Sequence, residues 1–128
     1  MRVWGAALLA AALLSGCAPR YRFPASYAPP VGLVEEGVAS WYGPGYHGNR
    51  TSNGEVYDQE ALTAAHASFA FGTRVRVTLL STRRSVVLRI NDRFPNHKGR
   101  IIDVSRAAAR TIGLIGPGTG RVRVEVVG

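Results

Sequence analysis

Cysteine and lysine are almost absent from this sequence of 128 residues, which contains one of each, Cys17 and Lys98. A single cysteine has no partner for an intramolecular disulfide, and the length suits one domain with one core. The positive charge is therefore nearly all arginine: 16 Lys plus Arg stand against 8 Asp plus Glu, a formal net charge of +8. Such a balance favours anionic partners, namely nucleic acid, acidic lipid headgroups or a polymer that carries carboxylates.

Three signatures of other protein classes are also missing. The sequence contains no internal repeat, and no glycine-rich phosphate loop follows a predicted strand. The three histidines, His47, His66 and His97, are 19 and 31 residues apart, whereas a zinc site has close and regularly spaced ligands. We therefore expect neither a metal nor another cofactor.

Long apolar runs are missing except at the N-terminus. Arg2 precedes an apolar run over 3–14, which has the length of a signal-peptide core and is shorter than the roughly 20 residues of a membrane span. The run ends in Leu-Ser-Gly-Cys17, which resembles the bacterial lipobox, although a chance cysteine after an apolar leader is the alternative. The pattern predicts a lipoprotein signal peptide over 1–16 and lipidation at Cys17. Ala18 rather than Asp at the next position favours the outer membrane if the source is Gram-negative.

This leader predicts an exported protein of the cell envelope, held at the membrane by its N-terminal lipid. An exported lipoprotein does not meet nucleic acid, so we discount that class of partner. Residues 17–36 contain four prolines and no apolar periodicity, which indicates an extended tether. The alternative is that the aromatic residues of this segment, Tyr21, Phe23 and Tyr27, pack on the domain.

From Gly37 onward the pattern is mainly β. Short apolar or alternating runs predict about six strands, among them 38–42, 74–79, 86–90, 100–104 and 121–126. One helix is predicted over 106–112, with Ser105 as its N-cap and Gly113 as its end. Short, evenly spaced strands with one or two short helices favour a small closed barrel over a parallel α/β sheet.

Most of the eight carboxylates have a simple structural explanation. Glu35 and Glu36 fall in the tether, and Asp58 and Glu60 fall in a solvated turn. Asp103 precedes the helix, whose N-terminus favours negative charge. Glu125 lies among outward-facing arginines. Glu55 and Asp92 remain. Glu55 follows a turn that can present it to a groove, although a structural role fits its spacing equally well.

Asp92 lies at the end of an apolar strand, between the amide of Asn91 and the cation of Arg93. A carboxylate in that position can serve acid–base chemistry, but an Asp92–Arg93 ion pair that braces a turn is the structural alternative. Two adjacent aromatic residues, Trp41 and Tyr42, have ring faces that can stack on sugars. If their strand alternates, one of them points into the core.

Several segments in order resemble the rare lipoprotein A (RlpA-like) family. They are Ala39-Ser-Trp-Tyr-Gly43, His47-Gly48, Thr51-Ser-Asn-Gly-Glu55, Leu62-Thr-Ala-Ala-His66, 75–78, 86–93 and 100–105 with the alanines at 107–109. The resemblance implies a six-stranded double-psi β-barrel over 37–127 and a lytic transglycosylase that acts on peptidoglycan. It places functional residues at Glu55, His66 and Asp92. One departure is Phe94, which precedes Pro95 where the family usually has Gly, so we expect a different lip of the site.

A lytic transglycosylase protonates the oxygen between N-acetylmuramic acid and N-acetylglucosamine, after which the muramyl C6 hydroxyl attacks C1. Because the nucleophile belongs to the substrate, one carboxyl can act first as acid and then as base. We predict Asp92 as this acid/base, tuned by Glu55 and His66. Further substrate contacts are predicted for Tyr42, His47, Asn91 and Arg93. The expected partners are peptidoglycan glycan strands and the membrane, and the protein is expected to be a monomer.

Two other functions fit the same features. One is a non-catalytic, expansin-like module that binds glycan, and the other is a lipoprotein scaffold at the division site. Only an enzyme would produce 1,6-anhydromuramyl ends.

Overall fold

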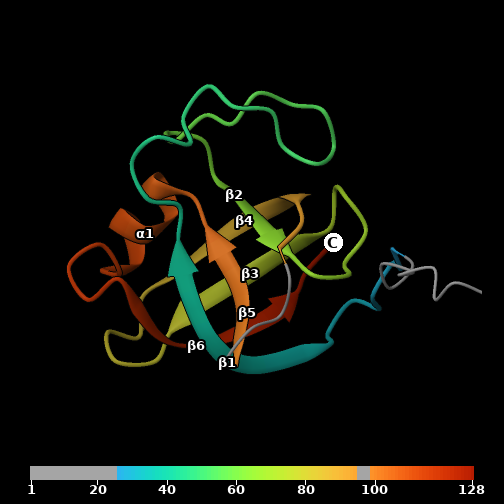
Figure 1. Ribbon diagram of the computed structural model, residues 1–128. Coiled ribbons are helices and arrows are strands. Elements are labelled where there is room, and N and C mark those ends of the chain that lie inside the picture. The colour runs from blue at the N-terminus through green and yellow to red at the C-terminus, as the bar shows by residue number, and fades with distance from the viewer. Residues whose placement is uncertain (1–25, 95–98) are drawn as a thin grey trace, which may run out of the picture.

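The computed structural model describes residues 26–94 and 99–128. Its elements are β1 (Val34–Trp41), β2 (Thr63–His66), β3 (Arg74–Leu79), β4 (Ser85–Asp92), β5 (Arg100–Val104), α1 (Arg106–Ile112) and β6 (Thr119–Val126). The six strands close into a barrel in the order β1-β5-β2-β4-β3-β6 (Figure 1). β1 runs parallel to β5 and β2 parallel to β4, and the other neighbours are antiparallel. The predicted six-stranded, mainly β barrel with a short helix is confirmed.

Alternating apolar residues build the core. In β3, Val75, Val77 and Leu79 are buried, while Arg74 and Arg76 between them are exposed. Leu88 and Ile90 of β4 join the same core cluster. Removing such side chains from water contributes about 1.5–3 kcal/mol each, which makes the interior of the barrel its main source of stability.

The helix forms where its capping residues predict it. The Ser105 hydroxyl accepts a hydrogen bond from the backbone N–H of Ala108, and Gly113 ends the helix with φ at 85°. A left-handed residue at that position favours glycine. The buried side of α1 consists of Ala108, Ala109 and Ile112, which belong to the core of the barrel. No helix in the described part of the chain is long and apolar enough to cross a membrane.

The barrel begins earlier than predicted. β1 starts at Val34, so Glu35 and Glu36 belong to a strand paired with β6 and not to a tether. Tyr27 also contacts the domain: its backbone bonds Ser68 and Ala70, and its ring packs edge-on against Phe69 with centroids 5.8 Å apart. The prediction of an extended tether up to residue 36 is therefore wrong for this part, because ladder pairing and aromatic packing hold it to the barrel. Tyr21 and Phe23 lie outside the described residues.

Candidate active site

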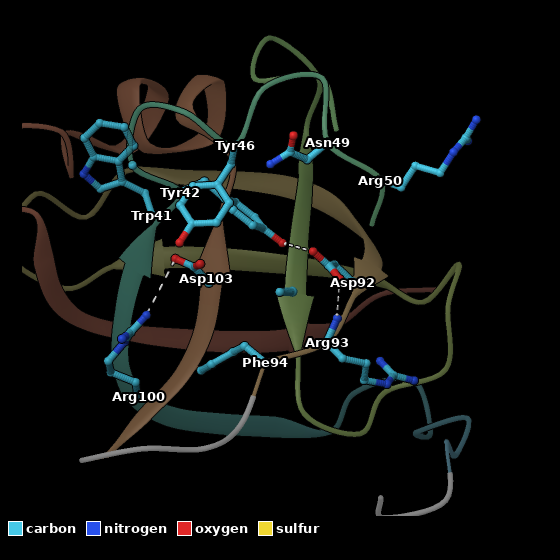
Figure 2. A pocket seen from close by; sticks show the side chains of 12 residues that line it. Trp41, Tyr42, Tyr46, Asn49, Arg50, Asp92, Arg93, Phe94, Arg100 and Asp103 are labelled. Atoms are coloured by element: carbon cyan, nitrogen blue, oxygen red, sulfur yellow. Dashed lines mark hydrogen bonds and ion pairs between the residues drawn. The ribbon is translucent and has the colours of Figure 1, made fainter. Parts of the chain in front are cut away.

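A pocket of about 490 Å³ lies where the loop between β1 and β2 meets the ends of β1, β4 and β5. This loop is drawn in green at the top of Figure 1. The residues that line the pocket are Trp41, Tyr42, Gly43, Tyr46, Asn49, Arg50, Ala65, Asp92, Arg93, Phe94, Arg100 and Asp103 (Figure 2). The lining thus includes two aspartates, three arginines and four aromatic residues.

The strand register builds the floor of this pocket. Ser40 of β1 pairs with Asp103 of β5, Asp103 pairs with Ala65 of β2, and Ala65 pairs with Asp92 of β4. Residues opposite one another on neighbouring strands project from the same face of a sheet. Ala65 is small and separates the two carboxylates. Asp103 and Asp92 therefore face the same pocket with a methyl group between their strands.

Asp92 is held by four hydrogen bonds. Its Oδ2 accepts from the hydroxyl of Tyr42 at 2.6 Å, and its Oδ1 accepts from the backbone N–H and the hydroxyl of Ser52 at 2.8 and 2.6 Å. The backbone N–H of Arg93 donates to Oδ1 at 2.9 Å. Burial alone would raise the pKa of Asp92, but the hydrogen bonds from Ser52, Tyr42 and Arg93 outweigh burial and leave the pKa below its ordinary value. Asp92 is therefore ionised in the free protein.

The structural alternative of an Asp92–Arg93 ion pair that braces a turn does not match the position of the Arg93 side chain. The guanidinium of Arg93 lies over the ring of Phe71 at 4.2 Å and donates to the carbonyl oxygen of His66 at 3.2 Å. Only the backbone of Arg93 bonds Asp92. This frees the Asp92 carboxylate for the pocket, as Figure 2 shows.

Asp103 is a site residue that the sequence did not reveal. It lies in β5 and lines the pocket, where its Oδ1 accepts from the hydroxyl of Ser40 at 2.9 Å. Asp103 does not bond the helix N-terminus, whose first three N–H groups donate to Tyr57, Gln59 and Ser105. Burial raises the pKa of Asp103, opposed by the Ser40 hydrogen bond and by Arg100, and increased by the charge of Asp92. The two carboxyls of the pocket thus have pKa values shifted in opposite directions.

Both aromatic residues that follow the core part of β1 line the pocket. Trp41 packs partly against the core, and Tyr42 reaches over the pocket floor to Asp92. Burial, and then the hydrogen bond to Asp92, raise the pKa of Tyr42 above its usual range, so its hydroxyl remains a donor. Phe94, the departure from the family pattern, packs against Tyr42, Tyr57 and Ala65 and forms part of the pocket wall.

Glu55 lies outside the pocket lining and braces the turn that presents Ser52. Its carboxylate pairs with the guanidinium of Arg89 at 2.5 and 2.9 Å and also accepts from the side chains of Asn53 and Asn91. Hydrogen bonds from Arg89, then Asn53 and Asn91, lower the pKa of Glu55 to about 2. Glu55 is therefore ionised at neutral pH. Its carboxylate contacts Asn53, the neighbour of Ser52, and Asn91, the neighbour of Asp92, and it does not line the cavity.

The Glu55–Arg89 pair predicts a pH-dependent stability. Because the folded-state pKa is lowered from 4.5 to about 2, the contribution is present above pH 4.5 and is lost as the pH falls toward 2. Glu55→Gln should have a lower melting temperature than the wild type at pH 7, and the difference should disappear by about pH 2. The pair is partly exposed, so the effect should be below about 1 kcal/mol. Thermal melts of both proteins across this range provide the measurement, and a difference that persists at pH 2 would contradict this assignment.

His66 is buried, with 3% of its surface exposed, and does not line the pocket. Its Nδ1 accepts from the backbone N–H groups of Ser68 and Phe69, both at 3.1 Å, and its ring stacks on Phe69 with centroids 3.7 Å apart. Because two donors point at Nδ1, the ring hydrogen is on Nε2, which lies 3.2 Å from Glu35. These surroundings are those of a packed imidazole and not of a group at the edge of the site.

Two predicted substrate contacts also lie outside the pocket lining. His47 accepts a hydrogen bond from the backbone N–H of Gln59 at 3.1 Å. Asn91 is 2% exposed and donates to Glu55. The structure instead brings Asp92, Tyr42 and Arg93 together, and adds Asp103, Arg100, Arg50, Asn49 and Tyr46 from other segments.

The sequence contains one signal that points to Asp103 as a site residue. Asp103 stands near the carboxyl end of its strand, as Asp92 does, and follows Arg100 by three residues. No comparable signal marks Asn49 or Arg50, which reach the pocket because the loop folds over it. Within residues 26–94 and 99–128, no group of three or more His, Cys, Asp or Glu side chains is arranged to hold a metal ion.

Comparisons with known proteins agree with this barrel. A family model described as "Lytic transglycolase" matches residues 34–125. The chain is 48% identical over 125 residues to the probable endolytic peptidoglycan transglycosylase RlpA of Synechocystis sp., covering 90% of this chain and 39% of that protein. It is 53% identical over 98 residues to the endolytic peptidoglycan transglycosylase RlpA of Campylobacter jejuni, covering 77% of this chain and 36% of that protein. The chain thus spans well under half the length of these relatives.

Solved structures support the fold alone, because their sequences differ widely. The Streptomyces papain inhibitor has a TM-score of 0.61 at 18% identity, over 77% of this chain and 98% of that chain. The expansin of Clavibacter michiganensis has a TM-score of 0.59 at 20% identity, over 75% of this chain and 51% of that chain. With the family match over most of the barrel, the resemblance noted in the sequence is confirmed: the chain belongs to the double-psi β-barrel lytic transglycolase family that includes the RlpA proteins.

Proposed function

We propose that this protein is an endolytic lytic transglycosylase that cleaves the bond between N-acetylmuramic acid and N-acetylglucosamine in peptidoglycan. The observation that carries the proposal is the pocket in which Asp92, fixed by Tyr42 and Ser52, faces a cavity lined by aromatic rings and arginines. Aromatic faces suit sugar rings, and guanidinium groups suit the carboxylates of a muramyl polymer. The names of its relatives support the same reaction and an endolytic mode.

The reaction needs a group that handles protons and a site that positions the muramyl C6 hydroxyl near C1. Asp92 is ionised, so it suits the base half of the role predicted for it, in which it accepts the proton of the C6 hydroxyl. Glu55 and His66 have positioning roles and do not contact the substrate. Glu55 stabilises the turn that carries Ser52 through Asn53, and His66 stabilises the segment after β2 by accepting hydrogen bonds from its backbone. Tyr42 and Arg93 line the cavity and are the proposed substrate contacts, whereas His47 and Asn91 are not.

Digestion of purified sacculi tests this function. Soluble products are separated and their masses measured: 1,6-anhydromuramyl ends are expected, because the internal C6 hydroxyl replaces water as nucleophile. Lysozyme, which leaves reducing ends, serves as the control. Sacculi that bind the protein but yield no anhydromuramyl ends would instead favour the expansin-like binding function.

We further propose that the protein is anchored in the membrane of the cell envelope through a lipid on Cys17. The support is the apolar run over 3–14 and the lipobox-like residues that end it, all of which lie outside the described residues. Cys17→Ser should abolish the mass increase of acylation and leave the protein unprocessed or soluble. Membrane fractionation and intact-mass measurement check this result, and a variant that stayed processed, acylated and membrane-bound would exclude it.

A further inference from the structure

We infer that Asp103 is the proton donor of the proposed reaction and that Asp92 is the base. This inference deepens the proposed function and rests on it. The resemblance places functional residues at Glu55, His66 and Asp92 and not at Asp103, whose place in the pocket comes from the barrel.

The first support is the register of the floor. Ala65 of β2 pairs with Asp92 on one side and with Asp103 on the other. Neighbouring strands are about 4.8 Å apart, so the Cα atoms of the two aspartates stand roughly 10 Å apart across Ala65. Ala65 itself is buried against Tyr42, Tyr57 and Phe94, and both carboxylates line the pocket to which Ala65 also belongs (Figure 2). A glycosidic bond that enters this pocket can therefore contact both carboxyls.

The second support is the unequal surroundings of the two carboxyls. Asp92 accepts four hydrogen bonds from Tyr42, Ser52 and Arg93, all of which favour its ionised form. Asp103 accepts one, from Ser40, and the described residues form no hydrogen bond to its Oδ2. Oδ2 is therefore the atom that can carry a proton toward the substrate.

The charged and titratable groups around Asp103 come from each neighbouring element. The guanidinium of Arg100 in β5 lies 3.9 Å from Oδ1 of Asp103. It donates its hydrogen bond to the Ser40 hydroxyl and not to Asp103. Asp92 of β4 is the nearby like charge, and Tyr42 and Tyr57 are un-ionised hydroxyls. Burial and the Asp92 charge raise the pKa of Asp103 against the lowering effects of Ser40 and Arg100. Two carboxyls with oppositely shifted pKa values are the usual basis for an acid and a base in one site.

The step balances without water or any co-reactant. The proton on Asp103 moves to the bridging oxygen as the bond from that oxygen to the muramyl C1 breaks, which releases the 4-hydroxyl of N-acetylglucosamine. The muramyl C6 oxygen bonds to C1, and its proton moves to the Asp92 carboxylate. Asp92 then loses this proton to solvent and Asp103 regains one, because both line a cavity on the protein surface.

A substrate with a better leaving group tests the assignment. The probe is a synthetic glycan oligomer in which C1 of the terminal N-acetylmuramic acid carries 4-nitrophenol, whose anion departs without protonation. Asp103→Asn should lose about 100- to 10,000-fold on sacculi, as expected for a positioned acid, but stay within about tenfold of the wild type on the aryl probe. Asp92→Asn should lose activity on both substrates. The matched control is Glu125→Gln, an outward carboxylate of β6 paired with Arg76 and Arg123, which should match the wild type on both.

Equal losses by Asp103→Asn on the two substrates, or full activity on sacculi, would overturn the assignment. A wild type inactive on both substrates would overturn the proposed function itself, which keeps the two failures distinct. If Asp103→Asn does not fold, Ser40→Ala provides the second test. It keeps the acid but removes the hydrogen bond that favours the ionised form, so the alkaline limb of the pH–rate profile should move to higher pH. An unchanged alkaline limb would contradict the inference.

Discussion

Replacing Asp92 by Asn is expected to lower the formation of anhydromuramyl ends by about 100- to 10,000-fold while the barrel stays folded. Asn has nearly the same shape: its one side-chain oxygen can still accept from Ser52, and its NH2 group can donate to the hydroxyl oxygen of Tyr42. It cannot accept the proton of the muramyl C6 hydroxyl, so the chemical step loses its base. Product yield and melting temperature measured on the same preparation give the result.

Glu55→Gln is the comparison for this variant. Glu55 acts on Asp92 only indirectly, through Asn53 beside Ser52 and Asn91 beside Asp92, so its loss should reduce activity less than the loss of Asp92. If Asp92 were only structural, Asp92→Asn would melt at a lower temperature and retain full activity in the folded fraction. Full activity in a folded Asp92→Asn protein would remove this residue from the mechanism.

Replacing His66 by Ala should destabilise the protein by on the order of 3–5 kcal/mol, because one buried and one partly buried backbone N–H group lose their acceptor at about 1–3 kcal/mol each. These groups belong to Ser68 and Phe69, and the variant also loses the stacking of the imidazole on Phe69. Small domains have a total stability of about 5–15 kcal/mol, so a large fall in melting temperature is expected. Denaturant unfolding at pH 7 measures the change in free energy.

The control for His66→Ala is Glu35→Gln, which keeps the Nδ1 acceptor and alters only the contact at Nε2. Glu35 is partly exposed, so this variant should lose less than about 1 kcal/mol. Activity per folded molecule separates the two roles of His66. A stable His66→Ala protein without activity would show that the imidazole takes part in the chemistry, as the family resemblance implies.

The barrel was largely predictable from local patterns. Alternation in 74–79 identified β3, and Ser105 and Gly113 bounded α1, because each signal depends on residues only a few positions apart. β2 was harder: its four residues are all buried, so they show no alternation. The start of β1 was missed because its pairing with β6 joins opposite ends of the domain.

The site was predictable only in part, and Asp103 shows why. In the sequence it is a carboxylate ahead of a helix, whereas in the barrel it lies beside Ser40, 63 residues earlier in the chain. Glu55 shows the converse, since its turn was read correctly but its carboxylate is engaged by Arg89, a residue of a later strand. In both cases the decisive neighbour is distant in sequence, and no local spacing encodes it.

The sequence by itself determined the class of fold, the positions of most strands and the helix, and the presence of Asp92 at a strand end. These properties follow from side-chain alternation, capping and ordered motifs, which the chain carries locally. Only the tertiary structure decided that Ala65 separates two carboxylates, that Ser52 and Tyr42 hold one of them ionised, and that burial raises the pKa of the other. Strand register and desolvation arise when distant segments pack, and a pKa depends on the resulting surroundings and not on the residue type.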